Sequence, residues 1–445
     1  MSSIGYNYIT FLNYKTLSLW DVKRYTQNHV SFRNAVKLKD VLSPYFEPVA
    51  KEKMISNNWQ IISKINFSGD LFLRDVSETI SFKGNLNKVD GDSLIYSKIN
   101  VRHGCIYYHP HNAIPFGVSS EYPVYKIDTT KVLGDYLVMV IQSKAFKKIL
   151  DKKATGISKA RVKPSEFLEI EIPIPALSVQ KELLYTYNSK TRQAESMDKE
   201  ACKIEEDINE YLIQALGIVI QREQKDQDGI YNYLRFHKLK DLSRWDLYNE
   251  KNKNYSEIYE NVKLSKVILS KPQYGAGYSS KPYDGKIRYI RITDINEDGS
   301  LNDTSVSANG FAEQYLLREN DFLIARSGNT VGKTFLYKKK YGKAIYAGYL
   351  IRFELNTEKI LPDYLLAYTK CSIYKNWIQG NMRVSAQPNI NSQQYLDSII
   401  VLPPMDIQKD IVSYVYEQKK IINQLKLDAK SIRKEAIKEF ENIVF

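Results

Sequence analysis

The segment Gly328–Thr334 (GNTVGKT) carries the residue types that can cradle a nucleotide phosphate. A phosphate-binding loop needs four residues between its glycines and a helix after it, whereas this segment has three residues between Gly328 and Gly332. Residues 335–341 (FLYKKKY), which follow, are typical of a strand. The sequence therefore favours a tight turn and a basic hairpin over a nucleotide site.

A second candidate for chemistry is the run 102–111 (RHGCIYYHPH), whose histidines and cysteine could ligate a metal. The potential ligands are His103, Cys105, His109 and His111. The corresponding positions in the second half of the chain hold Val331, Lys333, Tyr337 and Lys339, which cannot form such a site. We therefore expect no metal and interpret the run as an ordinary loop that can touch DNA.

The motifs of an amino-methyltransferase are missing. No N-P-P or D-P-P tripeptide occurs to grip a flipped base, and Pro403–Pro404 belongs to LPPM before a helical pattern. Gly275–Gly277 (GAG) lacks a third glycine at the spacing of a cofactor loop. We therefore predict a non-catalytic chain that binds no cofactor of its own.

Three polar regions carry the side chains that contact DNA, with Lys and Arg for phosphates and Arg, Lys, Asn or Gln for base edges. They are 97–103 with its counterpart 325–334, 152–163 with its counterpart 383–394, and 271–282 (KPQYGAGYSSKP). The candidate DNA-binding residues are Lys98, Arg102, Lys159, Arg161, Tyr274, Arg326, Asn329, Lys333, Arg383, Gln387, Asn389 and Asn391. The alternative for each of them is a solvated loop residue.

The composition agrees with a polyanionic partner. The 445 residues include 64 Lys and Arg against 51 Asp and Glu, a net charge of +13, and 34 tyrosines suited to contact surfaces. The three scattered cysteines argue against a disulfide framework. No apolar run long enough to span a membrane and no signal peptide are recognisable, so we expect a cytoplasmic protein.

The elements that must position these loops occur twice. Residues 132–183 align without gaps to residues 360–411 at an offset of 228, and ten of the 52 pairs are identical. Upstream, GDSLIYSK (91–98) resembles NDFLIARS (320–327). A period of half the chain is too long for a solenoid, so the sequence predicts two related globular domains, each followed by a shared element.

The shared element is a long helix, predicted over 179–216 and again from Ile407 to the end of the chain. Ser178 and Asp406 are suitable N-cap residues, and Gly217 suits the position after the first helix. Apolar residues recur at alternating spacings of three and four, which is a heptad pattern. The first seam is Tyr187, Lys190, Ala194, Met197, Ala201, Ile204, Ile208, Tyr211 and Ala215. The second is Ile411, Val415, Gln418, Ile422, Leu425, Ala429, Ile432, Ala436, Glu439 and Ile443.

These two stripes most simply bury each other as an antiparallel coiled coil, and the alternative is that each helix packs on its own domain. Residues 176–216 carry a net charge of −3 and residues 404–445 carry +1. The basic surplus of +15 therefore lies in the globular domains and their linkers, which is where a polyanion would bind.

The order and the twofold occurrence of these motifs resemble the specificity subunit of type I restriction-modification systems. The resemblance rests on IPIPALSVQKEL and VLPPMDIQKDI, the helices that follow them, and the GD-[SF]-LI-type strand of each half. QYGAGYSS…IRYIRITDI (273–295) adds to it, although 43–53 (SPYFEPVAKEK) shows no equivalent in the first half. The departure puts individual contact residues in doubt rather than the family.

The resemblance implies an α+β fold with two pseudo-symmetric target-recognition domains separated by an antiparallel coiled coil of two long helices. The predicted boundaries are recognition domain 1 at 1–175, spacer helix 1 at 176–217, a linker at 218–240, recognition domain 2 at 241–403 and spacer helix 2 at 404–445. Each domain would read one half of a bipartite, asymmetric sequence in double-stranded DNA, and the helices would set the gap. Two methyltransferase subunits, which use S-adenosylmethionine to methylate adenine at N6, would dock on the chain, and restriction subunits can join.

Two other functions remain open from the residues alone. One is a nucleic-acid-binding scaffold of another phage-defence or RNA-binding system with the same fold. The other is a coiled-coil assembly protein whose basic charge is incidental. Gapped double-stranded DNA, RNA, or no salt-sensitive nucleic-acid binding would distinguish the three.

Overall fold

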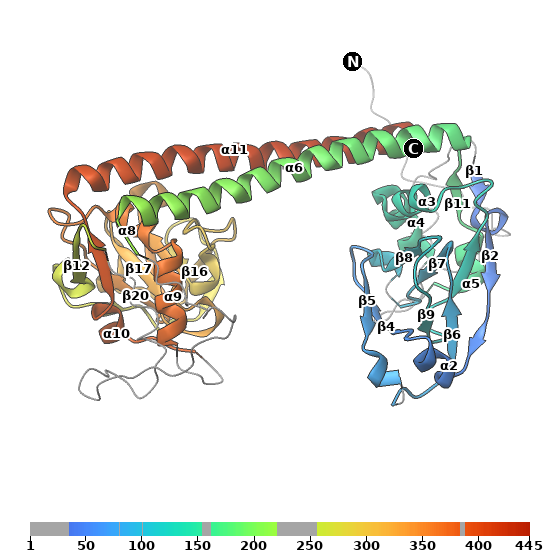
Figure 1. Cartoon of the computed structure of the whole chain (residues 1–445), viewed down its shortest axis with the longest axis horizontal. Helices are drawn as coiled ribbons and strands as arrows, with labels where there is room; N and C mark the ends of the chain where they lie inside the picture. Colours follow the sequence, from blue (N-terminus) through green and yellow to red (C-terminus); the bar gives the residue numbers. More distant parts are fainter. Residues whose placement is uncertain (1–34, 80, 100, 154–161, 220–255, 383–387) are drawn as a thin grey trace, which may run out of the picture. The chain divides into compact units, whose positions relative to one another are not determined.

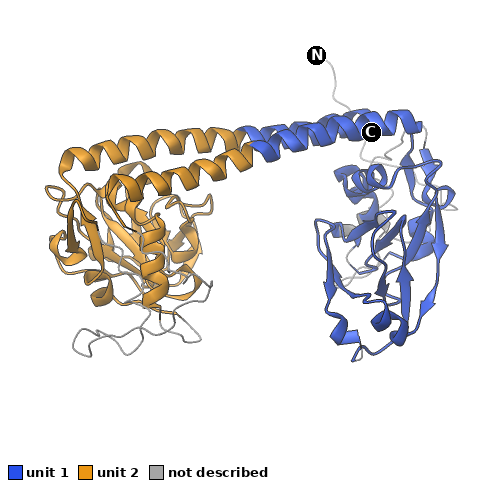
Figure 2. Cartoon of the chain, in the orientation of Figure 1, with its two compact units in different colours: residues 1–196, 428–445 blue, residues 197–427 orange. Residues whose placement is uncertain are grey.

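The computed structural model describes residues 35–79, 81–99, 101–153, 162–219, 256–382 and 388–445. The chain divides into two compact units, which Figure 2 colours separately. Unit 1 comprises residues 1–196 and 428–445, and unit 2 comprises residues 197–427. Each unit therefore contains one globular body and a segment of both long helices.

Unit 1 is built on a four-stranded antiparallel sheet of order β2-β10-β7-β8 and a five-stranded sheet of order β3-β6-β9-β4-β5. A separate antiparallel pair, β1 with β11, leads into the first long helix. The strands are β1 Ala35–Lys37, β2 Leu42–Tyr45, β3 Pro48–Val49, β4 Ile61–Ile65, β5 Leu71–Arg74, β6 Leu86–Val89, β7 Ser93–Tyr96, β8 Ile106–His109, β9 Phe116–Val118, β10 Val124–Ile127 and β11 Glu171–Pro173.

Unit 2 repeats this plan with a four-stranded sheet of order β13-β20-β17-β18 and the pair β12 with β21 before the second long helix. Two further pairs, β14 with β16 and β15 with β19, complete the body. The strands are β12 Glu260–Lys263, β13 Gln273–Tyr274, β14 Ser280–Pro282, β15 Arg288–Ile290, β16 Val306–Ala308, β17 Phe322–Ala325, β18 Thr334–Leu336, β19 Ala344–Tyr346, β20 Leu350–Phe353 and β21 Ile399–Leu402.

The two four-stranded sheets correspond strand by strand. β7 and β17 are the matching inner strands, and every residue of both is buried, which explains their unbroken apolar runs SLIY and FLIA. Both pair antiparallel with β10 or β20 on one side and with β8 or β18 on the other. The 229-residue shift between GDSLIYSK and NDFLIARS is therefore a structural equivalence.

Helices cover these sheets at equivalent positions (Figure 1). The helices are α2 Lys51–Ser56, α3 Gly134–Gln142, α4 Lys144–Lys153, α5 Pro164–Leu168, α6 Leu177–Ala215, α8 Pro362–Tyr368, α9 Ser372–Asn381, α10 Ser392–Leu396 and α11 Met405–Val444. The buried Tyr136 hydroxyl of α3 donates to Pro173 O at 3.0 Å, and the buried Tyr364 hydroxyl of α8 donates to Val401 O at 2.6 Å. Each bond ties a helix to the strand that precedes a long helix.

The long helices α6 and α11 run antiparallel within each unit (Figure 1). In unit 1 the first part of α6 meets the last part of α11, where Lys190 Nζ lies 2.6 Å from Glu439 Oε1. In unit 2 the last part of α6 meets the first part of α11, where the rings of Tyr211 and Tyr414 lie 3.9 Å apart. The α+β class with two related bodies and an antiparallel helix pair is thereby confirmed.

The seam of α6 is confirmed over its whole length, because every predicted member is buried or half-buried. The seam of α11 is confirmed except at its end. Ile443 is 66% exposed, whereas Phe440 and Val444 are buried. The prediction at Ile443 is wrong because α11 finishes on the body of unit 1, where Phe440 packs against Tyr136, and this turns a different face of the helix inward.

The predicted N-caps are also wrong. Gln180 N donates to Ala176 O and Gln408 N donates to Pro404 O, so each helix begins two residues earlier than the sequence indicated. Ser178 and Asp406 consequently lie inside the first turn. The end of α6 is confirmed, because Gly217 has φ +57° and a Cβ there would lie 2.4 Å from Ile258 Cδ1. All but two residues of the predicted linker, 218–240, lie outside the described residues.

Candidate nucleic-acid interface

The candidate site of unit 2 lies at one edge of its four-stranded sheet. β17 runs antiparallel to β20 with Ala325 opposite Leu350, and β13 runs antiparallel to β20 with Tyr274 opposite Ile351. The residues that end or flank these strands therefore meet: Tyr274, Arg326 and Tyr349. Tyr274 is 37% exposed and Tyr349 is 55% exposed, so this edge faces solvent.

Arg326 is held in a defined position at this edge. Its guanidinium carbon lies 4.9 Å from the centre of the Tyr274 ring, a cation–π contact, and its Nε donates to Asn389 Oδ1 at 3.3 Å. Within the described part of the chain, these contacts use the face and the Nε of the guanidinium rather than its terminal nitrogens. The terminal nitrogens are the atoms that recognise guanine edges or phosphate in a bidentate manner.

The third polar region joins the same site. The Tyr274 hydroxyl donates to Ser392 Oγ at 3.1 Å and accepts from Ser392 N at 3.1 Å. Asn391 caps α10, since its Oδ1 accepts from Gln394 N at 2.9 Å. Three segments that are far apart in the sequence thus converge, and each contains predicted DNA-binding residues.

Unit 1 places a cation in the same backbone frame. Lys98 N donates to Glu121 O at 3.2 Å, as Arg326 N donates to Tyr349 O at 2.9 Å. Val162 N donates to Lys98 O at 3.3 Å, as residue 390 N donates to Arg326 O at 2.9 Å. Every equivalent position differs by 228 residues, so the repeat positions one basic side chain in each body. Lys98 Nζ donates to Ser120 O at 2.6 Å.

Asn329 and Lys333 lie in the hairpin loop between β17 and β18. Asn329 is exposed in the turn 328–330, whereas Lys333 Nζ lies 2.8 Å from Glu297 Oε1 and is drawn away from Arg326. A strand, β18, follows the loop, so the turn and hairpin predicted in place of a phosphate-binding loop are confirmed.

Some predicted residues cannot be placed. Lys159, Arg161, Arg383 and Gln387 lie outside the described residues, and so does the side chain of Arg102. Sequence reasoning also missed Tyr349 and Ser392, which complete the site. Tyr349 could have been found from its offset of 228 residues to Glu121, but neither residue has a distinctive motif.

Two basic side chains behind the hairpin are unsuited to phosphate contact. Burial lowers the pKa of Lys370 to about 7, and the neighbouring charge of Lys419 lowers it further. Lys370 Nζ donates to Thr334 O at 3.2 Å, inside the body. Burial also lowers the pKa of Lys419. The positive charge available to a partner is therefore carried by the exposed loops.

The metal interpretation of residues 102–111 gains no support. Cys105 and His109 are buried, and His111 Nδ1 hydrogen-bonds Asp92. In the described ranges, no three His, Cys, Asp or Glu side chains are grouped so that they could hold a metal ion. A search of the same ranges finds no helix long and apolar enough to cross a membrane.

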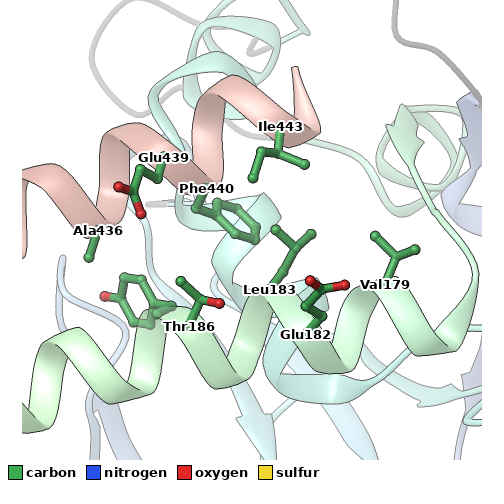
Figure 3. Close-up of a pocket in the computed structure, with 9 residues that line it drawn as sticks. Val179, Glu182, Leu183, Thr186, Ala436, Glu439, Phe440 and Ile443 are labelled. Carbon is green, nitrogen blue, oxygen red and sulfur yellow. The ribbon is translucent and has the colours of Figure 1, made fainter.

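A second surface feature is an apolar groove of about 200 Å³ between α6 and α11 in unit 1 (Figure 3). Leu183 and Phe440 form its floor, and the side chains of Val179 and Ile443 stand at its rim. Val179 is 37% exposed and Ile443 is 66% exposed, so two helices present apolar side chains to solvent together. The sequence could not predict this groove because Ile443 was expected inside the seam.

Comparison with known proteins places these features in context. Residues 259–431 match the family described as the type I restriction modification DNA specificity domain. The chain is 27% identical over 117 residues to the Type I restriction enzyme EcoEI specificity subunit of Escherichia coli, covering 25% of this chain and 20% of that protein. It is 20% identical over 295 residues to the EcoKI specificity subunit of Escherichia coli strain K12, covering 64% of this chain and 58% of that protein.

The fold has a counterpart among solved structures. A chain from a study of complex assembly and conformational transition of the type I R-M system matches with a TM-score of 0.53 at 16% identity. The match covers 94% of this chain and 97% of that one. The overlap with both curated relatives is shorter, at about a fifth and under three fifths of their lengths.

Proposed function

We propose that this chain, which belongs to the type I restriction-modification specificity family, reads a bipartite, asymmetric sequence in double-stranded DNA for a methyltransferase complex. Recognition domain 1 (1–175) would read one half of the sequence and recognition domain 2 (241–403) the other. The spacer helices (176–217 and 404–445) would set the unspecified gap. The chain would contribute address and spacing, and partner subunits would bind S-adenosylmethionine, flip the target adenine and methylate it at N6.

The observation that carries this proposal is the repeated backbone frame around Lys98 and Arg326. Two equivalent cations in two related bodies suit two separate half-sites, because each body can address the duplex with the same edge. The neighbouring side chains differ, with Glu121 opposite Tyr349, so the two half-sites would differ in sequence. Arg102, Lys159, Arg161, Arg383 and Gln387 remain proposed contacts on the same loops.

A binding selection tests the function. The chain, assembled with its methyltransferase partner, is presented with random double-stranded DNA at several salt concentrations. We expect two fixed half-sequences separated by a fixed unspecified gap, and an affinity that falls steeply with salt because phosphate contacts release counterions. A preference for RNA would favour the other defence or RNA-binding scaffold. Salt-insensitive or absent binding would favour a pure assembly protein.

The apolar groove between α6 and α11 is the proposed docking place of a methyltransferase subunit, with a restriction subunit joining the assembled complex. Interface cores need apolar side chains that water does not cover, and Val179, Leu183 and Ile443 supply them. Ile443→Glu should weaken association with the methyltransferase subunit about tenfold or more, because a charge would be desolvated there. Titration by gel filtration or calorimetry measures it.

The matched control for this prediction is Ile258→Glu, because Ile258 is 67% exposed and lies outside both helices. Both variants should unfold at the wild-type temperature, since neither isoleucine is buried. Equal association of the two variants with the methyltransferase subunit would exclude the groove as the docking place.

A further inference from the structure

The start of α6 is fastened to its body by one buried glutamine. Gln180 is 0% exposed, and its Oε1 accepts from Leu133 N at 2.9 Å. Its Nε2 donates to Lys131 O at 2.9 Å and to Pro175 O at 2.8 Å. Both amide hydrogens and the oxygen are therefore used, and the reversed amide would set oxygen against two carbonyls. The bonds join the helix, the segment before α3 and the residue after β11.

The start of α11 carries the same arrangement. Gln408 is 1% exposed, and its Oε1 accepts from Leu361 N at 2.7 Å. Its Nε2 donates to Lys359 O at 3.0 Å and to Pro403 O at 2.9 Å. All four residues lie 228 positions after their equivalents in unit 1. The two units thus repeat a three-bond clamp, atom for atom, at the first turn of each long helix.

The other end of each helix is held differently. α6 finishes with Leu212 and Leu216 in the core of unit 2, and α11 finishes with Phe440 and Val444 in the core of unit 1. Apolar contacts are non-directional and tolerate small rotations, whereas hydrogen bonds fix an angle. The direction in which each helix leaves its body is therefore set at the glutamine.

Small errors at this point are amplified along the helix. α6 has 39 residues, so at about 1.5 Å per residue it extends roughly 58 Å. A change of about 3° at its first turn would displace its far end by roughly 3 Å over that length. The rise of one base pair is about 3.4 Å. An error of a few degrees at the clamp is thus comparable to one base pair of DNA.

We propose that Gln180 and Gln408 are positioning residues that determine how sharply the protein discriminates the length of the DNA gap. The inference rests on the proposed function and adds to it a division of roles. The loops around Lys98 and Arg326 select the bases, and the glutamine clamps make the distance between the two half-sites single-valued.

The test uses the Gln180→Met, Gln408→Met and double variants in the full complex with the methyltransferase subunit. Methionine keeps the length of the side chain and removes all three hydrogen bonds. The readout is a binding selection on DNA libraries that differ only in gap length. Wild type should select one length. In the double variant, sites one base pair longer or shorter should rise about tenfold relative to the main site, the ratio that one lost hydrogen bond can offset.

Two controls separate positioning from stability. Met54→Ala and Ile290→Ala open cavities in fully buried cores of units 1 and 2 that lack the clamp residues, so they should lower the unfolding temperature without broadening the gap. Half-site sequences should stay unchanged in every variant. A folded double variant that still selects one gap length, or controls that broaden the gap equally, would overturn the inference.

A milder substitution keeps the inference testable if the methionine variants do not fold. Leu133 has φ −77° and Leu361 has φ −71°, values that proline adopts. Leu133→Pro with Leu361→Pro removes a single donor from each clamp, and we expect the same broadening to a smaller extent. If these variants also fail to fold while the cavity controls fold, the glutamines are stability elements only, and the positioning role is rejected. If wild type selects no gapped site, the proposed function fails first.

Discussion

The Arg326→Ala variant is expected to lose discrimination at one base position of one half-site and to keep the other half-site unchanged. Arg326 is preorganised by the Tyr274 ring and Asn389, and its terminal nitrogens point to a bidentate contact. Loss of such a contact costs about 1–3 kcal/mol of discrimination against the wrong base. A binding selection on the assembled complex measures it, position by position.

Two further variants interpret that result. Arg326→Lys keeps the charge but loses the planar fork, so it should behave like alanine if Arg326 reads a base and like wild type if it contacts only phosphate. Lys98→Ala is the matched variant of unit 1 and should affect only the other half-site. A uniform loss of affinity across all sequences for Arg326→Ala would contradict base reading.

Inserting one heptad into both long helices should lengthen the unspecified gap and leave both half-sequences unchanged. The insertion points are Ser196/Met197 in α6 and Leu427/Asp428 in α11, where the two compact units divide. Seven residues add about 10.5 Å, the rise of about three base pairs. Affinity should fall as well, because three base pairs turn the duplex by about 100° whereas a heptad changes the helix phase by about 20°.

The control for the heptad insertion is the same insertion into α6 alone. Two helices of unequal length cannot both reach their anchoring residues, Leu212 with Leu216 and Phe440 with Val444, so this variant should fail to assemble. Methylation sequencing of cells that express each variant with its partner subunit records the gap. An unchanged gap in the paired insertion would reject the spacer role.

Much of the architecture could be predicted because it is repeated and periodic. The 228-residue offset identified two related bodies, and heptad spacing identified both helices within two residues of their ends. The family match at residues 259–431 confirms the resemblance to type I specificity subunits. These signals are local or regular along the chain, so they survive without knowledge of tertiary contacts.

The site could be predicted only in part, because its residues come together through strand register. Arg326, Tyr274 and Asn389 were each expected to contact DNA, but nothing in their spacing shows that they touch one another. Ile443 was misassigned because tertiary packing of Phe440 and Val444 overrides the heptad at the end of α11. The clamp glutamines lie in a motif used only to recognise the repeat, and their role depends on backbone groups about 50 residues earlier.

The last turns of α11 also complete the core of unit 1, with Phe440 and Val444 packed beside Tyr136 and Leu183. During synthesis on the ribosome, these two side chains emerge more than 250 residues after Leu183. The first body therefore stays open until the second has been translated, and its exposed apolar surface would be a natural substrate for chaperones during that interval.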